Sequence, residues 1–474
     1  MLSKKLFTYI NTFSSSDIRK LEKFIQSPYH NEIQELSTLY SILKPSFLNG
    51  SETIPQKKEV WSQLFPNKPY SDVKIRKMAS LLLNLAIEFK AYETLKARPE
   101  QKLLLELLAV SRPGLSIHIA GVNRKLAQTI NQNSSNSAEY NFYRFRHSAQ
   151  NHRILELENN RKKLLKLEEL HQANEYLDIF YYAQKMALIA DIIGYQGFMN
   201  ISNQPNTAIK TLDAVKNASF FHKPIIQVYY LIIRMLSNKE QESFFFELKD
   251  WLQKNNQHFS KSQKKTFYAH LINYCISHQI NKGNHTFFSH AFEVLSTMVS
   301  QKLIFDPFID PNYYRNIITI GLQIGKFEYI RDFISTHSSA LPPEQKENAE
   351  TYNLARLYYK QKQYDKVLEL LHNVELTNIS YALGAKTILI GTYFALDEYR
   401  ALESLLISFR IFILRNKLLA KNTKQSYLNF LKFTKKLIYL APYDKESKEK
   451  LKETIIKNNN VAVKDWLLEQ INNP

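Results

Sequence analysis

The sequence contains little cysteine and little glycine, and it lacks the short motifs of common enzymes. Cys275 is the only cysteine among 474 residues, so neither an intrachain disulfide nor a zinc site built on cysteines can form, and a reducing compartment is expected. Only ten glycines and few turn clusters argue against an α/β nucleotide-binding enzyme. No GxxxxGK[ST] or GxGxxG phosphate-binding loop, no GxSxG motif and no Cys/His catalytic signature is present. These absences predict a protein that is not an enzyme and that has no cofactor.

Long apolar runs are also missing. No run approaches the roughly 18 residues that a membrane-spanning helix needs. Residues 1–17 contain two lysines, but their apolar run is short and interrupted and no cleavage site of a signal peptide follows. We therefore expect a soluble, cytoplasmic protein.

The histidines give no pattern typical of a metal site. His270, His278, His285 and His290 are separated by 8, 7 and 5 residues. A pair of ligands on one helical face needs a spacing of four. We predict that these are ordinary histidines and that no metal is bound. Cys275, on an apolar helical face, is expected in the core.

The clearest positive signal is a pair of amphipathic segments in residues 349–376. On one face of the first segment lie Leu354, Ala355, Tyr358 and Tyr359. After a polar Lys-Gln-Lys-Gln turn, an apolar stripe is formed by Tyr364, Val367, Leu368, Leu371 and Val374. Ala355 allows the two helices to approach closely. Neither helix can bury its stripe alone, so the pattern predicts a helical hairpin that packs against neighbours.

Weaker copies of this hairpin flank it. Tyr393 and Tyr399 follow Tyr358 and Tyr364 by 35 residues, and Phe327 precedes Tyr364 by 37. An earlier copy has Tyr274 and Phe287 in similar roles. Over about residues 264–412 the chain resembles the tetratricopeptide repeat family, whose period is about 34 residues. The matching residues are Leu354, Ala355, Tyr358, Tyr364, Val367 and Val374, with Val at the last two positions, where Ala is usual; the terminal Pro of the motif is missing from all copies.

The few glycines and the long stretches of 3.6-residue periodicity predict an all-α fold, and the helices expected near the N-terminus could form a compact bundle. The resemblance adds a right-handed α-solenoid of helical hairpins. We expect a bundle over residues 1–98, a middle helical segment over 99–200, and tetratricopeptide-like repeats with C-terminal capping helices over 207–474. The stretches NQNSSNS (131–137) and SNQPN (202–206) look like linkers. In the bundle, Ser14 and Ser71 are expected to cap helices ending near Gln26 and Lys96.

Two prolines and a charged stretch also give local expectations. Pro45 should end a helix that begins near Glu32, and Pro55 should lie in the first turn of the next helix. Residues 161–171 should form one helix. Residues 21–31, 70–89 and 177–193 are similar to parts of large helical proteins of Bacteroidota, from which no activity can be carried over.

The resemblance also implies a binding groove, because the first helix of each hairpin lines the concave side of tetratricopeptide-like stacks. Carried over by position, the groove residues are Arg315, Thr319, Tyr352, Arg356, Tyr359, Lys360 and Phe394. Basic and aromatic side chains would suit an acidic or extended peptide. The Lys/Asn constellation of the chaperone-tail-binding subclass is absent. We expect a non-enzymatic scaffold that binds a peptide or protein partner in this groove; the alternative is that these residues only pack or are solvated.

The charge of the chain suggests a different partner. The net charge is +19, and residues 410–464 contain fourteen Lys or Arg residues and four Asp or Glu residues. Interleaved with them are the aromatic residues Phe412, Tyr427, Phe430, Phe433 and Tyr439. The alternative function is thus a nucleic-acid-associated regulator that uses Lys432, Lys435 and Lys436. An anionic membrane, an acidic partner and simple solvation of helix surfaces also stay open as explanations of the basic charge. Leucines lie at helical spacing near the aromatic residues, which indicates that most of the aromatic side chains pack in the core.

Overall fold

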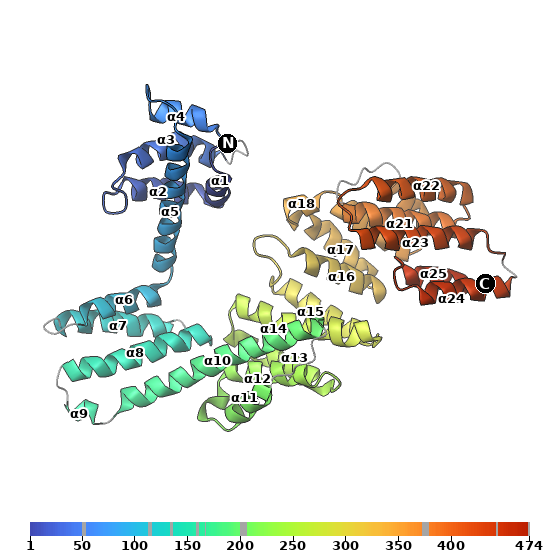
Figure 1. Cartoon of the computed structure of the whole chain (residues 1–474). Coiled ribbons are helices and arrows are strands. Elements are labelled where there is room, and N and C mark those ends of the chain that lie inside the picture. The colour runs from blue at the N-terminus through green and yellow to red at the C-terminus, as the bar shows by residue number, and fades with distance from the viewer. Residues whose placement is uncertain are drawn as a thin grey trace. The chain divides into compact units, whose positions relative to one another are not determined.

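The computed structural model describes residues 1–49, 54–111, 116–132, 136–157, 161–165, 167–199, 206–371, 379–441 and 444–472. Over these residues the protein is all-α, with one isolated bridge between Phe305 and Ile309 and no strand (Figure 1). None of the described helices is both long and apolar enough to cross a membrane. Backbone contacts divide the chain into two units, Met1–Ala187 with Lys210–Gln227 and Leu188–Ile209 with Val228–Pro474.

The first unit begins with helices that surround one hydrophobic core. These helices are α1 (Lys4–Ile10), α2 (Ser15–Gln26), α3 (Gln34–Leu48), α4 (Lys57–Leu64) and α5 (Asp72–Lys96). Every member of this core lies between Leu2 and Phe89. The predicted caps are confirmed, because the hydroxyls of Ser14 and Ser71 accept hydrogen bonds from backbone N–H groups in the first turns of α2 and α5.

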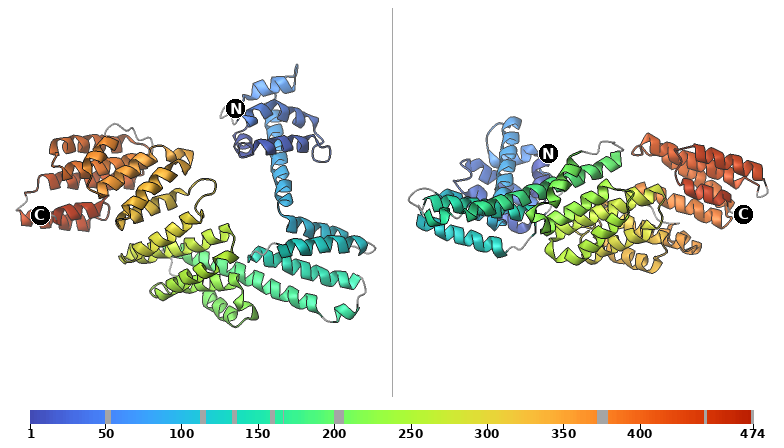
Figure 2. Two further views of the ribbon diagram at one scale, coloured as in Figure 1. Left: turned by 180° about the vertical axis from the view of Figure 1, so that it is seen from behind. Right: turned by 90° about the horizontal axis from the view of Figure 1, so that it is seen from below.

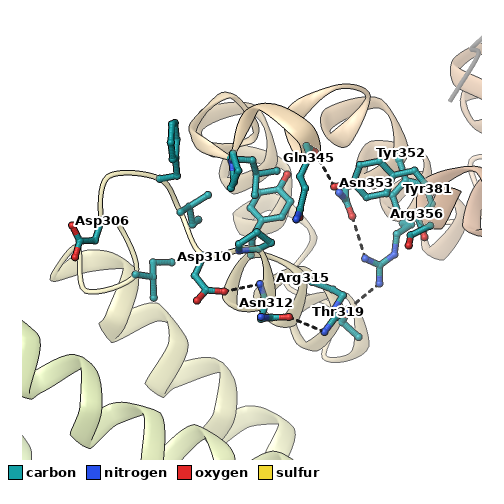
Figure 3. A pocket seen from close by; sticks show the side chains of 18 of the residues that line it. Asp306, Asp310, Asn312, Arg315, Thr319, Gln345, Tyr352, Asn353, Arg356 and Tyr381 are labelled. Carbon is teal, nitrogen blue, oxygen red and sulfur yellow. Dashed lines mark hydrogen bonds between the residues drawn. The ribbon is translucent and has the colours of Figure 1, made fainter. Parts of the chain in front are cut away.

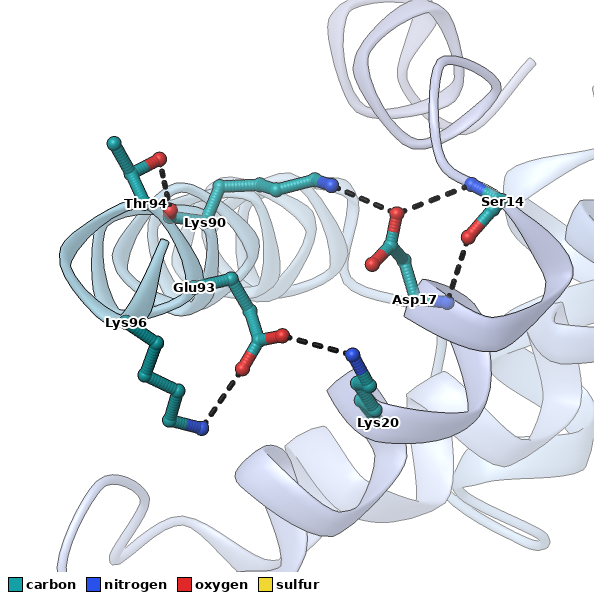
Figure 4. Close-up of polar contacts among 7 residues, drawn as sticks. All are labelled: Ser14, Asp17, Lys20, Lys90, Glu93, Thr94 and Lys96. Carbon is teal, nitrogen blue, oxygen red and sulfur yellow. Dashed lines mark hydrogen bonds and ion pairs between the residues drawn. The ribbon is translucent and has the colours of Figure 1, made fainter. Parts of the chain in front are cut away.

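Ion pairs join α2 to α5 at the edge of this core (Figure 4). The Lys90 ammonium donates to the Asp17 carboxylate at 2.8 Å, and this bond is the main reason that the pKa of Asp17 is lowered. Glu93 accepts from Lys20 at 3.0 Å and from Lys96 at 2.8 Å. Asp17 thus both completes the cap of α2 and ties that helix to α5.

The two predictions from proline are wrong. Pro45 lies inside α3, which continues to Leu48. The helix continues because Phe47 is buried against Phe7, with ring centroids 5.0 Å apart. Pro45 has no N–H to donate to the Ser41 carbonyl, but Ser41 is exposed, so water can take the place of that donor. Pro55 precedes α4, which begins at Lys57, and the Pro55 carbonyl instead accepts a hydrogen bond from the Leu2 N–H at 2.9 Å.

The first unit continues through α6 (Pro99–Val110), α7 (Ser116–Gln132), α8 (Ala138–Leu157) and α9 (Arg161–Leu164). The prediction of one helix over 161–171 is wrong: α9 ends at Leu164, and Leu167 has a left-handed backbone with φ of 53°. The division between the units falls within α10 (Glu168–Met199), α11 (Asn206–Lys216) and α12 (Pro224–Ser237). Residues 133–135 and 202–205 of the linker-like stretches lie outside the described residues, and the domain boundaries stay predictions.

The second unit contains successive antiparallel helices, which the two views of Figure 2 show from other directions. Its helices are α13 (Ser243–Asn255), α14 (Lys261–Asn273), α15 (Phe287–Ser300), α16 (Pro311–Gln323), α17 (Phe327–His337), α18 (Pro343–Lys346), α19 (Ala349–Lys360), α20 (Tyr364–Leu371), α21 (Ile379–Ala395), α22 (Tyr399–Arg415), α23 (Lys421–Ile438), α24 (Lys445–Lys457) and α25 (Lys464–Asn472). Contacts join α16 to α17, α19 to α20 and α21 to α22 as hairpins. Further contacts of α17 with α19 and of α19 with α21 link one hairpin to the next.

The aromatic residues that marked the sequence copies take equivalent places in these hairpins. Phe287, Phe327, Tyr364 and Tyr399 are the first residues of α15, α17, α20 and α22. In the last three hairpins a residue with positive φ lies two positions earlier, namely Gly325, Lys362 and Asp397. The predicted turn after α19 is therefore found, with its reversal at Lys362. Ala355 is fully buried between α19, α20 and α21, whereas Val374 lies outside the described residues.

The helix α14 continues into a π-helical segment, Tyr274–Gln279. Cys275 in this segment has no exposed surface, which confirms its expected place in the core, and burial raises the pKa of its thiol. The Gln279 amide donates to the Tyr274 hydroxyl at 2.9 Å, and that hydroxyl donates to the Lys239 carbonyl at 2.9 Å. These bonds satisfy polar groups in an otherwise apolar interior.

Candidate functional site

A cleft of about 790 Å³ lies in the second unit between α16, α19, the start of α21 and the two loops before α16 and α19 (Figure 3). Among the residues that line it are four of the predicted groove residues, Arg315, Thr319, Tyr352 and Arg356. The hairpin packing explains their meeting, because α16 and α19 are in contact and present these side chains on one side. We refer to this space as the α16–α19 cleft.

Arg356 is the central cation of the α16–α19 cleft. Its guanidinium donates to Thr319 Oγ1 at 2.9 Å and to Asn353 Oδ1 at 3.1 Å, which are both uncharged acceptors (Figure 3). No carboxylate of the described residues forms an ion pair with it. Burial lowers the pKa of Arg356, and the nearby charge of Arg315 lowers it further. A half-buried cation with neutral partners is the arrangement that an incoming anion stabilises.

Aromatic rings form the wall beside Arg356. The rings of Tyr352 and Tyr381 stack with centroids 4.9 Å apart, and the Arg356 guanidinium lies 5.9 Å from the Tyr352 ring centroid. The Tyr381 hydroxyl donates to the Gln345 carbonyl at 3.2 Å, which holds this ring on the side of the loop before α19. Flat rings held in this way offer apolar contact area without a large loss of side-chain entropy on binding.

The cleft also contains acidic groups. Asp306 and Asp310 lie along the loop before α16, and Lys265 lines the same space. The Asp310 carboxylate accepts a hydrogen bond from the Asn312 N–H at 2.9 Å and so caps α16. Arg315 donates to Asn312 Oδ1 at 3.3 Å. The cleft is therefore mixed in charge, with Arg356 on α19, Arg315 on α16 and Lys265 on α14, and with the two carboxylates along the loop that leads into α16.

A smaller cavity of about 330 Å³ shares Thr319, Tyr352 and Arg356 with the cleft. Its further lining residues include two more of the predicted groove residues, Tyr359 and Lys360. Burial raises the pKa of Tyr359 to about 12, so its hydroxyl stays protonated and able to donate. Together the two cavities bring six of the seven predicted groove residues onto one surface.

Phe394 lines neither cavity. Its ring packs against Trp466 of α25, with centroids 5.5 Å apart, and belongs to the C-terminal core.

The sequence did not point to two glycines on which the tyrosines rest. A Cβ on Gly384 of α21 would lie 2.7 Å from Tyr352 Cζ, and a Cβ on Gly391 would lie 2.8 Å from Tyr359 Cζ. The two tyrosines are seven residues apart on α19 and the two glycines are seven residues apart on α21, so the same contact repeats after two helical turns. The sequence did contain a signal for this contact, because the chain has few glycines and two of them lie seven residues apart in one apolar helix. Asn353 and Tyr381 were also missed.

The three predicted nucleic-acid residues lie together on α23. Lys432, Lys435 and Lys436 line a cavity of about 600 Å³ with Tyr439 and with Lys450 of α24. Tyr439 is 67% exposed, and its hydroxyl donates to the Glu403 carboxylate. Of the interleaved aromatic residues, Phe430 and Phe433 are buried, which removes them from any stacking surface.

The histidines are spread over different contacts. His270 and His278 are buried, His285 stacks on Phe288, and His290 lies against Phe246. Within the described ranges, no group of three or more His, Cys, Asp or Glu side chains could hold a metal ion.

The chain was also compared with known proteins. No protein-family model, no curated protein and no solved structure matches it.

Proposed function

We propose that the protein is a non-enzymatic scaffold that binds a peptide or protein partner in the α16–α19 cleft. In this proposal the hairpins of the second unit form a tetratricopeptide-like, right-handed solenoid whose first helices line the concave side. The contacts of α17 with α19 and of α19 with α21 favour such a stack. The observation that carries the proposal is the Arg356 guanidinium, which is half-buried beside Arg315 and hydrogen-bonded only to neutral side chains.

The same surface favours an extended partner with acidic groups. The cleft and the smaller cavity share Arg356 and Tyr352, so one segment can contact Arg315 at one end and Lys360 at the other. A carboxylate placed on Arg356 would gain charge-assisted hydrogen bonds, and the tyrosine rings would cover apolar side chains. The residues lining these cavities do not assemble a nucleophile, base and orienting group, so a binding role fits them better than catalysis.

The test uses the purified full chain as bait in native lysate, with and without nuclease, at low and high salt. We expect a discrete partner that survives nuclease and is only modestly weakened by salt. Arg356→Glu should weaken its capture by about 2–5 kcal/mol, because the partner's anion would meet a carboxylate in place of a half-buried cation. Isothermal titration with the recovered partner measures this loss.

Arg331→Glu is the matched control. Arg331 lies on α17, pairs with Glu328 at 2.8 Å and lines neither cavity, so its reversal should leave affinity unchanged. Circular dichroism of both variants separates lost binding from lost folding. Equal affinity of wild type and a folded Arg356→Glu variant would contradict the proposed site.

We propose as the second candidate a nucleic-acid-associated regulator that uses Lys432, Lys435 and Lys436. The favouring observation is that these lysines share one cavity with the exposed Tyr439 and have no ion pair with a carboxylate of the described residues. This candidate predicts loss of all captured partners on nuclease treatment and a steep fall of affinity with salt. Replacing the three lysines with Gln should then reduce the salt slope, whereas Arg356→Glu should have no effect.

A further inference from the structure

Helix α22 carries apolar side chains on two sides. Its buried side contributes to the C-terminal core through Leu402, Leu406, Phe409 and Ile413. On the other side Ile407, Ile411 and Leu414 are 65%, 44% and 53% exposed, and Leu418 in the following turn is 83% exposed. We name these four exposed residues the α22 stripe.

The spacing places the helical members of the α22 stripe on one face. Ile411 follows Ile407 by four positions and Leu414 follows Ile411 by three, and residues at these spacings are neighbours on a helix surface. Leu418 is held in its turn because its N–H donates to Asn416 Oδ1 at 2.9 Å. Single exposed apolar residues are common on protein surfaces, but a contiguous group of this kind marks an interaction site.

Cations border the α22 stripe. With 3.6 residues per turn, Arg410 lies about 60° to one side of Ile407 and Arg415 about 80° to the other. Also exposed in or near α22 are Arg400, Lys417 and Lys421. None of these five cations pairs with a carboxylate in the described part of the chain. The acidic residue nearest the stripe on this side of the helix, Glu403, already accepts a hydrogen bond from Tyr439.

We propose that the α22 stripe and its bordering cations bind the surface of an anionic lipid bilayer. An apolar row between cations is complementary to acyl chains that lie beneath anionic headgroups. A second copy of the chain is a poorer match, because the unpaired guanidinium groups of both copies would face each other. The α22 stripe lies on one face of a single helix and lines neither the α16–α19 cleft nor the lysine cavity. A fluid bilayer interface needs no preformed groove. This membrane contact is independent of peptide binding in the cleft.

Vesicle sedimentation with the purified full chain tests the proposal. We expect the protein to bind vesicles made of equal parts phosphatidylcholine and phosphatidylserine and not vesicles of phosphatidylcholine alone. Arg410→Gln combined with Arg415→Gln should weaken binding roughly 25-fold, since each cation near an anionic surface contributes about fivefold. Leu418→Asp should weaken it at least about tenfold, because one leucine side chain would no longer enter the interface.

Matched controls lie in the first unit. Leu165 is also 83% exposed, so Leu165→Asp changes the same kind of side chain away from the stripe. Arg124 and Lys125 of α7 are exposed neighbours whose double Gln variant removes the same charge. Both controls should bind the anionic vesicles as wild type does.

Three results would overturn the proposal. The first is no preference for the anionic vesicles. The second is equal loss of binding in the stripe variants and the controls, which would indicate that only the net charge matters. The third is a wild-type dimer in light scattering without lipid that Leu418→Asp converts to a monomer, which would make the stripe an interface between copies. Circular dichroism confirms that each variant is folded before it is scored.

Discussion

His278 is a buried titratable side chain with positive neighbours. It lies in the π-helical segment and is 9% exposed. Burial is the main reason that its pKa is lowered to about 4, and the charges of Lys239 and Lys282 lower it further while Glu240 acts against them. The pKa of a histidine in the unfolded chain is about 6.5. The folded protein therefore binds fewer protons than the unfolded chain between these two values.

This difference predicts a loss of stability in mild acid. Stability from His278 is fully present above the unfolded pKa and is lost as pH falls from about 6.5 towards the folded pKa of about 4. Between pH 7.5 and pH 5 the free energy of unfolding of the second unit should fall by about 2 kcal/mol through this residue. Urea unfolding at both pH values measures it. Burial also lowers the pKa of His270. His278→Gln is therefore the comparison, because it removes the titrating group of His278 and leaves that of His270 in place. Identical pH slopes for the two proteins would contradict the assignment.

The residues of the α16–α19 cleft were predictable from the sequence only in part. The resemblance placed Arg356 and Thr319 on one side of the hairpins, and their side chains are hydrogen-bonded across 37 positions of the chain. It could not reveal that Asn353 is the second acceptor, because that depends on the side-chain direction within α19. Phe394 was placed by the same positional rule, but its ring packs against α25, a contact that no repeat pattern encodes.

At the scale of elements, the approach of α19 to α21 depends on the glycines beneath two tyrosines. The Tyr352 ring cannot move freely away from Gly384, because it is stacked on Tyr381. Gly384→Ala should therefore lower the free energy of unfolding by about 1–3 kcal/mol through overpacking. Thermal and urea unfolding measure the change, and the Tyr fluorescence of the second unit should change with it.

Gly121→Ala provides the comparison for that substitution. Gly121 lies within α7, and a Cβ there meets nothing within 4 Å. The same chemical change should stabilise the protein by about 0.5–1 kcal/mol, because alanine is the better helix former. If Gly384→Ala and Gly121→Ala change the free energy of unfolding in the same direction, close packing of α19 on α21 does not explain the effect of Gly384→Ala.

Helix boundaries were predictable where local chemistry decides them. Ser14 and Ser71 mark the beginning of α2 and α5 through bonds to residues three positions further on, a spacing that the sequence displays directly. Pro45 failed as a signal because the burial of Phe47, a tertiary contact, outweighs the missing backbone bond. The end of α9 at Leu164 was missed because neither glycine nor proline occupies the left-handed position of Leu167.

At the scale of the whole molecule, the N-terminal core is closed within its own segment. Because its members all lie between Leu2 and Phe89, residues 1–98 should fold when produced alone. The fragment should unfold cooperatively with a free energy of about 5–15 kcal/mol. Phe7→Ala should reduce this by about 3–5 kcal/mol, because Phe7 is only 2% exposed and packs on Phe47.

Tyr29→Ala serves as the control for the fragment, since Tyr29 is 87% exposed. It should change stability by no more than about 0.5 kcal/mol. A fragment that is helical but melts without a cooperative transition would show that the bundle needs the rest of the chain.

The all-α class followed from composition and periodicity, because both are properties of the whole chain. The division into two units could not be predicted from composition or periodicity, because it falls inside α10, α11 and α12 rather than at a linker-like stretch. Contacts between helices distant in sequence decide such a division, and a single sequence does not display them.

The burial of Cys275 gives the second unit a chemical reporter of its own. The chain has one thiol, it has no exposed surface, and its raised pKa keeps it in the unreactive protonated form. A thiol-specific reagent can therefore modify the native protein only while the helices around Cys275 are transiently open. The rate of that modification, compared with the rate in the unfolded chain, measures the free energy of this opening without any engineered label.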